Sequence, residues 1–185
     1  MSLEDDIKIY TRQIEENPKA YGVYNNRGWV YYELGQYERA IKDYNKAIEL
    51  NPNWYLLYNN RGLAYSELNL NELAIQDFTK SLELDPNNFW TTIRRGEAYS
   101  KLNLYELAIE DFSKAIEIDS SSLEAYFNRS IAYSCLNKYE RAIADISRYI
   151  ELNPDDAKAY YLRGKYSRDL SRSDFERAKS LGYEE

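Results

Sequence analysis

The sequence predicts an all-α protein built as a linear array of antiparallel helix hairpins. Three observations support this fold class. One pattern returns every 34 residues, the apolar residues within each period follow helical spacing, and Gly, Asn and Pro recur where helices must end. The prolines all share one position of the period, and they are Pro18, Pro52, Pro86 and Pro154.

The period is marked by a short motif around an arginine. It reads Asn26-Arg27-Gly28 and returns, with changes, at residues 60–62, 94–96, 128–130 and 162–164. We place position 1 of the repeat at Tyr21 and expect one solenoid domain. Its full repeats are residues 21–54, 55–88, 89–122 and 123–156, preceded by a half-repeat at 1–20 and followed by a shortened capping repeat at 157–185.

The first helix of each repeat is predicted to end at position 15. In the first repeat Tyr24, Gly28, Tyr31 and Leu34 lie at i, i+4, i+7 and i+10, which is one face of a helix. Gly and Asn tolerate the left-handed conformation that closes a helix C-terminus. The residues at position 15 are Gly35, Asn69, Asn103, Asn137 and Ser171.

A second apolar stripe in each repeat predicts a second helix. In the first repeat it is Ala40, Tyr44, Ala47 and Ile48, and the proline pair that follows stops the helix because proline cannot continue the hydrogen-bond ladder. Gly at position 8 removes a side chain where the two helices approach closely. One hairpin cannot bury its apolar faces alone, but stacked copies form a continuous core.

Both ends of the chain depart from the full repeat. The half-repeat resembles a second helix alone, since Ile7, Tyr10 and Ile14 share one face. Near the other end, Phe175 and Ala178 fit the pattern only if five residues are deleted from the turn. An array that opens mid-repeat is consistent with a natural cap or with a piece of a longer protein. A polar cap on the last hairpin is expected from Arg168, Arg172, Arg177 and Lys179.

Position 7 is arginine and position 23 is aspartate in every repeat. The two positions lie nearly level across the hairpin, so we predict a ladder of partly buried ion pairs. The alternative is a set of arginines that bind an acidic ligand, and the consistent pairing favours the structural role. The expected pairs are Arg27–Asp43, Arg61–Asp77, Arg95–Asp111, Arg129–Asp145 and, after the deletion, Arg163–Asp174.

These repeats resemble the tetratricopeptide repeat (TPR) family. That family has aromatic, small and proline residues at fixed positions, and the first repeat matches through Tyr24, Gly28, Tyr31, Ala40, Tyr44, Ala47 and Pro52. The resemblance covers nearly the whole chain and implies a right-handed α–α superhelix, the TPR solenoid. Thr92, Ser120, Ser130 and Tyr149 depart from the pattern, which affects local packing and not the fold.

Composition argues against the common enzyme classes. The chain has no His, one Cys, and 24 basic against 31 acidic residues. A Ser/His/Asp triad and an imidazole zinc site are therefore excluded. The net negative charge disfavours nucleic acid, and no apolar run approaches the roughly 20 residues of a membrane span. We expect no enzyme activity, cofactor or metal, and a cytoplasmic protein.

The resemblance also implies a ligand site. In this fold the first helices line a concave surface, and here those positions are unusually apolar with interspersed asparagines. Aromatic side chains would anchor a ligand and Asn amides would pair with its backbone, although part of this set could instead pack on adjacent helices. The predicted peptide-binding groove consists of Asn26, Trp29, Asn60, Leu63, Trp90, Ile93, Arg94, Phe127, Asn128 and Tyr161.

We therefore expect a non-catalytic protein–protein interaction scaffold that binds a peptide or helix of a partner. Two alternatives remain: the targeting portion of a larger enzyme or regulatory protein, and a self-assembly module that binds another copy. The carboxylate clamp that some family members use is not expected, because only Asn60 and Arg94 match its five elements.

Overall fold

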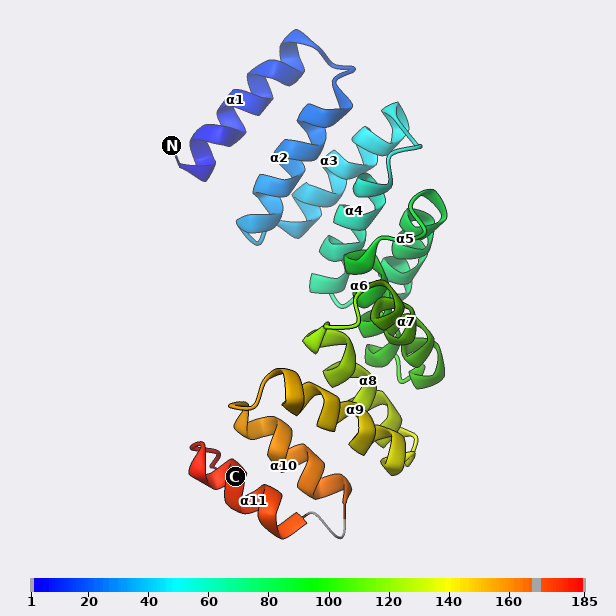
Figure 1. Ribbon diagram of the computed structural model, residues 1–185. Coiled ribbons are helices and arrows are strands. Elements are labelled where there is room, and N and C mark those ends of the chain that lie inside the picture. The colour runs from blue at the N-terminus through cyan, green and yellow to red at the C-terminus, as the bar shows by residue number, and fades with distance from the viewer. Residues whose placement is uncertain (1, 168–170, 185) are drawn as a thin grey trace. The chain divides into compact units, whose positions relative to one another are not determined.

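A computed structural model describes residues 2–167 and 171–184, which form eleven α-helices and no strand (Figure 1). None of the helices in this part of the chain is long and apolar enough to cross a membrane. Arg168 of the expected polar cap lies outside the described residues. The helices are α1 (Leu3–Glu16), α2 (Tyr21–Glu33), α3 (Tyr37–Leu50), α4 (Tyr55–Glu67), α5 (Asn71–Leu84), α6 (Phe89–Lys101), α7 (Tyr105–Ile118), α8 (Leu123–Cys135), α9 (Tyr139–Leu152), α10 (Ala157–Tyr166) and α11 (Ser171–Ser180).

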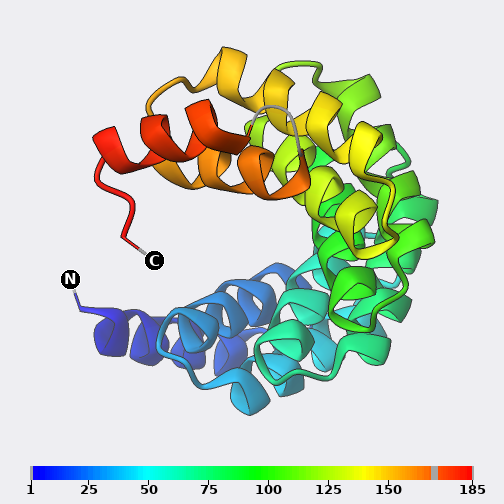
Figure 2. The same cartoon turned by 90° about the horizontal axis from the view of Figure 1, so that it is seen from below.

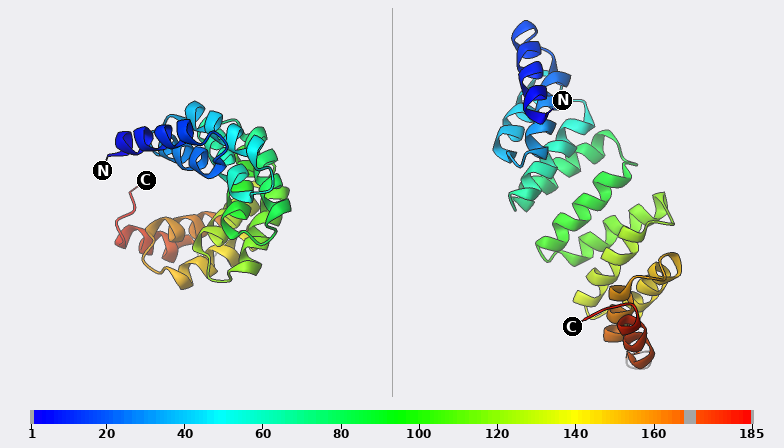
Figure 3. Two further views of the ribbon diagram at one scale, coloured as in Figure 1. Left: turned by 90° about the horizontal axis from the view of Figure 1, so that it is seen from above. Right: turned by 90° about the vertical axis from the view of Figure 1, so that its left-hand side faces the viewer.

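The chain divides into two compact units, residues 1–98 and 99–185, with the boundary inside α6. In the first unit each helix from α1 to α5 packs against its neighbour in sequence, and α2 also contacts α4 (Figure 1). In the second unit α7 to α11 pack in the same way. There α10 and α11 lie side by side as one hairpin (Figure 2, Figure 3). The predicted all-α array of hairpins is confirmed.

The predicted ends of the first helices are confirmed in four repeats. Gly35, Asn69, Asn103 and Asn137 have φ angles of 70°, 57°, 60° and 56°, the left-handed conformation expected at position 15. The prediction was wrong for Ser171, which begins α11. Because the last hairpin has a shorter turn, α10 already ends at Tyr166.

Glycine at position 8 makes room for the ring at position 24 of the same repeat. A Cβ at this glycine would lie 2.7–2.9 Å from a ring carbon, closer than real contacts allow. The pairs are Gly28–Tyr44, Gly62–Phe78 and Gly164–Phe175. The fourth repeat has Ser130 with Ile146 instead, and Ser130 Oγ donates to the Phe127 carbonyl at 2.7 Å. In this repeat Ile146 at position 24 is smaller than an aromatic ring, and it leaves room for serine in place of glycine at position 8.

Four of the five predicted Arg–Asp pairs form, and each is bidentate. Arginine Nε and Nη2 donate to the two carboxylate oxygens at 2.7–2.9 Å, and the aspartates are 3–6% exposed. The pairs are Arg27–Asp43, Arg61–Asp77, Arg129–Asp145 and Arg163–Asp174. The last pair is separated by 11 residues, not 16, which confirms the five-residue deletion. Arg95 and Asp111 belong to different units, and their pairing stays a prediction.

The arginines make further contacts that the sequence reasoning missed. In each of these four pairs Nη1 donates, at 2.6–3.3 Å, to a polar side chain of the preceding second helix, and these acceptors are Thr11, Asn45, Ser113 and Ser147. The Arg61 guanidinium also lies 5.8 Å from the rings of both Tyr58 and Tyr65. The hydrogen bonds that Arg27 donates to the Asp43 carboxylate raise the pKa of Arg27. We call these Arg–Asp pairs the ion-pair ladder, and each arginine in it links three helices.

Candidate functional site

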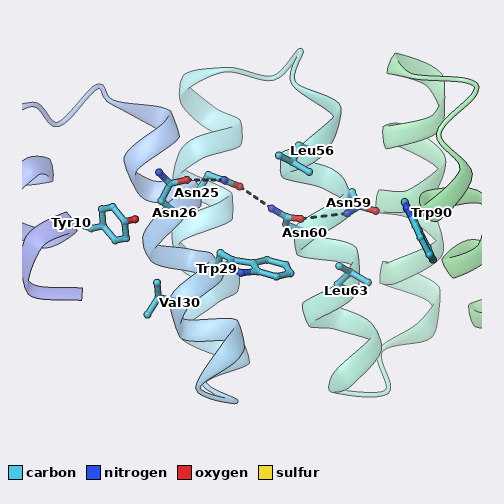
Figure 4. Close-up of a pocket in the computed structure, with 10 residues that line it drawn as sticks. All are labelled: Tyr10, Asn25, Asn26, Trp29, Val30, Leu56, Asn59, Asn60, Leu63 and Trp90. Carbon is cyan, nitrogen blue, oxygen red and sulfur yellow. Dashed lines mark hydrogen bonds between the residues drawn. The ribbon is translucent and has the colours of Figure 1, made fainter. Parts of the chain in front are cut away.

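The first unit contains a cavity of about 600 Å³ between the first helices of its repeats (Figure 4). Its walls come from α1, α2, α4 and α6, and none of its lining residues carries a charge. The lining residues are Tyr10, Asn25, Asn26, Trp29, Val30, Leu56, Asn59, Asn60, Leu63 and Trp90. This is the groove of the first unit.

Most of the lining residues fall into three stripes that cross the helices. The spacing of three to four residues puts successive positions on one helix face, and the 34-residue period brings equivalent residues of neighbouring repeats into line. The upper stripe is Leu56 and Trp90 at position 2, and the lower stripe is Trp29 and Leu63 at position 9. Figure 4 shows four asparagines between Leu56 and the lower stripe, and this amide stripe consists of Asn25, Asn26, Asn59 and Asn60.

The amide stripe is one continuous chain of hydrogen bonds. Asn25 Nδ2 donates to Asn26 Oδ1 at 3.3 Å, and Asn60 Nδ2 donates to Asn25 Oδ1 at 3.0 Å. Asn59 Nδ2 donates to Asn60 Oδ1 at 3.4 Å, and Thr91 Oγ1 donates to Asn59 Oδ1 at 2.9 Å. Asn25 and Asn60 are only 6% and 5% exposed. The chain therefore satisfies these two buried amides.

Two carboxylates lie beyond the lower stripe. Trp29 Nε1 donates to Glu33 Oε1 at 3.0 Å, and the Trp29 ring stacks on Tyr32 at 5.2 Å between centroids. Tyr32 Oη donates to Glu67 Oε1 at 3.4 Å. Burial, followed by the charge of Glu67, raises the pKa of Tyr32 to about 12, so this hydroxyl stays a donor at neutral pH. We call Glu33 and Glu67, both at position 13, the acidic edge.

Comparison with protein families identifies the repeats. A tetratricopeptide repeat model matches residues 22–53, 55–88 and 93–122, and a second tetratricopeptide repeat model matches residues 123–156. The chain belongs to the tetratricopeptide repeat family. A model of the protein prenyltransferase alpha subunit repeat also matches residues 3–34. TPR arrays are scaffolds for protein interactions and are generally not catalytic.

Solved structures share the TPR fold over most of this chain. YrrB, a TPR protein with an unusual peptide-binding site, aligns with a TM-score of 0.84 and 24% identity over 94% of this chain and 92% of its own. MamA aligns with a TM-score of 0.83 and 22% identity over 87% of this chain and 91% of its own.

The C-terminal part of a TPR repeat-containing protein from Cytophaga hutchinsonii gives a TM-score of 0.84 and 18% identity, over 97% of this chain and 76% of its own. Such low identities show a common fold and not a common ligand. No curated protein matches the sequence.

Five of the ten predicted groove residues of this TPR array line the cavity, and they are Asn26, Trp29, Asn60, Leu63 and Trp90. Trp90 is 61% exposed and Trp29 is 38% exposed, so both rings are open to a ligand. Asn60 differs because its side chain is buried and bonded to Asn25. The exposed amide of the stripe is that of Asn26.

Ile93 and Arg94 do not line the cavity. Ile93 is 0% exposed, and its side chain is part of the core and not of a surface that a ligand can reach. Arg94 is half-buried, and its Nη1 donates to Glu97 Oε2 at 2.8 Å. It follows Thr91, Thr92 and Ile93, all of which are buried, so this turn of α6 packs inward.

The three remaining predicted residues, Phe127, Asn128 and Tyr161, belong to the second unit. The Phe127 ring packs 5.2 Å from that of Tyr149, and Lys158 Nζ lies 5.4 Å from the Phe127 ring. Tyr161 lines a separate cavity of about 630 Å³ and stacks on Tyr183 at 4.5 Å. The assignment of these three residues to a peptide-binding groove stays a prediction.

Tyr10 and Val30 line the cavity although they were not predicted to do so. Tyr10 lies 34 residues before Tyr44, at position 24, where Tyr44 and Phe78 are fully buried beneath the first helix of their own repeat. Tyr10 is only half-buried, and its side chain lines the groove. The 34-residue period, which places Tyr10 at an aromatic position next to the first helices, was the signal that could have identified it.

The described residues contain no group of three His, Cys, Asp or Glu side chains arranged to hold a metal ion. Cys135, the free thiol, is exposed at the end of α8 in the second unit.

Proposed function

We propose that the groove of the first unit binds an extended peptide segment of a partner protein. The observation that carries this proposal is the amide stripe, which runs between two apolar stripes in an uncharged cavity. Open apolar surface with a few ordered polar groups is typical of a binding site. The same uncharged lining offers nothing to the phosphates of a nucleic acid.

An extended peptide suits the amide stripe better than a helix does. Asn side chains offer both donors and acceptors, as a peptide backbone does. The backbone groups of a helix already bond to one another, whereas those of an extended segment are available. Packed helices lie about 8–10 Å apart, and an extended chain advances about 3.3 Å per residue. We therefore expect about three ligand residues for each repeat crossed.

The likeness to YrrB is consistent with this proposal, because that TPR protein is described as having a peptide-binding site. The identity of 24% supports the shared scaffold only. The side chains that line the groove of this chain determine which ligand it binds, and substitutions at these positions test that preference.

The proposal is tested with a library of fluorescein-labelled nine-residue peptides, measured by fluorescence anisotropy. Peptides that bind the unmodified protein are measured again with Trp90→Ala and Asn26→Ala. Both side chains are exposed, so their removal should weaken binding about tenfold or more while the array stays folded.

Trp54→Phe is the matched control, because Trp54 does not line the groove and packs edge-on against Tyr21 at 5.7 Å. It should bind as the unmodified protein does. Asn60→Ala is not suitable, since it would leave the buried Asn25 carbonyl without its donor. Unchanged affinity in both Trp90→Ala and Asn26→Ala would overturn the proposal.

A further inference from the structure

We propose that the ligand of this groove is an extended peptide in which apolar and basic residues alternate. The inference rests on the proposed function, since it names the ligand class of the same groove. It follows from the order of the upper stripe, the amide stripe, the lower stripe and the acidic edge across the first helices.

The first step concerns the two apolar stripes. Successive side chains of an extended chain point in opposite directions. If the ligand backbone lies over the amide stripe, one set of side chains meets Leu56, which Figure 4 shows above the stripe, and the other meets Trp29 and Leu63 below it. The upper stripe has no charged lining residue, and burying an unpaired charge there would be costly. The side chains on that side are therefore apolar.

The second step concerns the lower stripe. Position 13 lies four residues beyond position 9 on the same helix face, which is about 6 Å at 1.5 Å per residue. A Lys or Arg side chain can cover that distance with its aliphatic stem on the Trp29 ring and its charged head at the acidic edge. The face of a tryptophan ring also attracts a cation.

The third step is the charge at the acidic edge. Glu33 and Glu67 each accept a hydrogen bond from a neutral donor, Trp29 Nε1 and Tyr32 Oη. Among the described residues neither carboxylate forms an ion pair, and nearby Arg94 is paired with Glu97 at 2.8 Å. The two neutral donors hold the carboxylates in place and leave their negative charge for a ligand cation.

Three fluorescein-labelled nine-residue peptides test the inference by anisotropy at low salt. One alternates Leu and Lys, the second has the same residues in two blocks, and the third alternates Leu and Glu. The first two have equal charge and composition, so only the order of residues separates them. We expect the alternating Leu–Lys peptide to bind about tenfold more tightly than either of the others.

Matched substitutions then test whether the acidic edge causes the preference for basic ligand residues. Glu33→Gln combined with Glu67→Gln should lower affinity for the Leu–Lys peptide about tenfold and leave an alternating Leu–Ser peptide unaffected. The control combines Glu38→Gln with Glu72→Gln, two exposed acids in the first turns of α3 and α5, and changes the net charge equally. The control should bind as the unmodified protein does.

The outcomes separate the two proposals. Equal binding of the alternating and blocked peptides, or equal losses in the two double variants, overturns the alternation inference. If Trp90→Ala still weakens binding about tenfold or more in that case, the peptide groove stands. If Trp90→Ala and Asn26→Ala bind every peptide as tightly as the unmodified protein, the proposed function fails as well.

Discussion

The ion-pair ladder and the amide stripe are both polar networks that join neighbouring repeats, yet they behave differently along the chain. The ladder repeats the same chemistry in every pair that the structure describes, down to the bidentate geometry. The stripe changes: asparagine is at position 5 in Asn25 and Asn59, but the third repeat has Ile93 there.

The difference separates structure from recognition. The four described pairs are the same in each repeat, and every arginine in them also donates to a side chain of the preceding second helix, so this network holds neighbouring helices together. A network that changes from repeat to repeat, and that borders open tryptophan rings, provides a surface for one particular ligand. Substitutions in the ladder should therefore change stability, whereas substitutions in the groove should change affinity.

The largest effect is expected from Arg61→Ala in the ladder. It removes both hydrogen bonds to Asp77, which is 5% exposed, and leaves a buried carboxylate without its partner. We expect a loss of about 3–5 kcal/mol in the free energy of unfolding, measured by urea denaturation. Lys80→Ala, which breaks an exposed pair with Glu83, is the control and should cost less than about 1 kcal/mol. Equal stabilities of these two variants would contradict the structural role.

Gly62→Ala should be the next most damaging. The new Cβ would lie 2.7 Å from the Phe78 ring, and overpacking of about 1–3 kcal/mol exceeds the helix-propensity gain of about 1 kcal/mol. Gly22→Ala, which meets open space, should be neutral or stabilising. Adding Phe78→Ile to Gly62→Ala imitates the Ser130–Ile146 pair and should recover part of the loss in urea denaturation. If the losses in unfolding free energy of Gly62→Ala and Phe78→Ile simply add in the double variant, the two side chains do not pack directly against each other.

Trp90→Ala provides the opposite result, a loss of affinity without a loss of stability. The side chain is 61% exposed and contacts the Phe89 ring at 5.0 Å, so its removal should change the unfolding free energy by less than about 0.5 kcal/mol. Thermal unfolding followed by circular dichroism checks this value. A midpoint lowered as far as that of Arg61→Ala would show that Trp90 belongs to the core and not to the groove.

Tyr44→Phe should have a modest effect of the opposite sign, because it should stabilise the protein. The Tyr44 hydroxyl is buried without a hydrogen-bond partner among the described residues, and the second repeat has Phe78 at the same position. Removing an unsatisfied hydroxyl should raise the unfolding free energy by about 1 kcal/mol. Tyr58→Phe is the matched control, since that hydroxyl donates to the Pro52 carbonyl at 3.0 Å and its loss should be destabilising. A destabilised Tyr44→Phe would mean that its hydroxyl does have a partner.

The sequence was sufficient to predict features that depend on the position within the repeat. The left-handed residues at Asn69 and Asn103 follow from the period, and so does the pairing of Arg163 with Asp174 after a five-residue deletion. Each of these depends on one hairpin, whose short turn fixes the positions that meet. These predictions succeeded because the geometry within one hairpin determines which of its residues meet.

The groove was predicted less completely because it depends on contacts between hairpins. Asn60 donates to Asn25 in the preceding repeat, and no residue spacing shows that two side chains 35 residues apart will bond to each other instead of to a ligand. The burial of Ile93 depends on how closely α6 packs, and the exposure of Tyr10 to the groove depends on how α1 packs against α2. These features depend on packing between helices, which the pattern within one repeat does not specify.

The most direct test is an NMR titration of the isotope-labelled protein with the alternating Leu–Lys peptide. Side-chain amide signals of Asn26 and Asn59 and the indole signals of Trp29 and Trp90 report on the groove, while the Nε–H signals of Arg27 and Arg61 report on the ladder. We predict that the groove signals shift as the peptide is added and that the two arginine signals stay in place. Shifts of the arginine signals with unchanged asparagine and tryptophan signals would contradict the assignment of recognition to the groove.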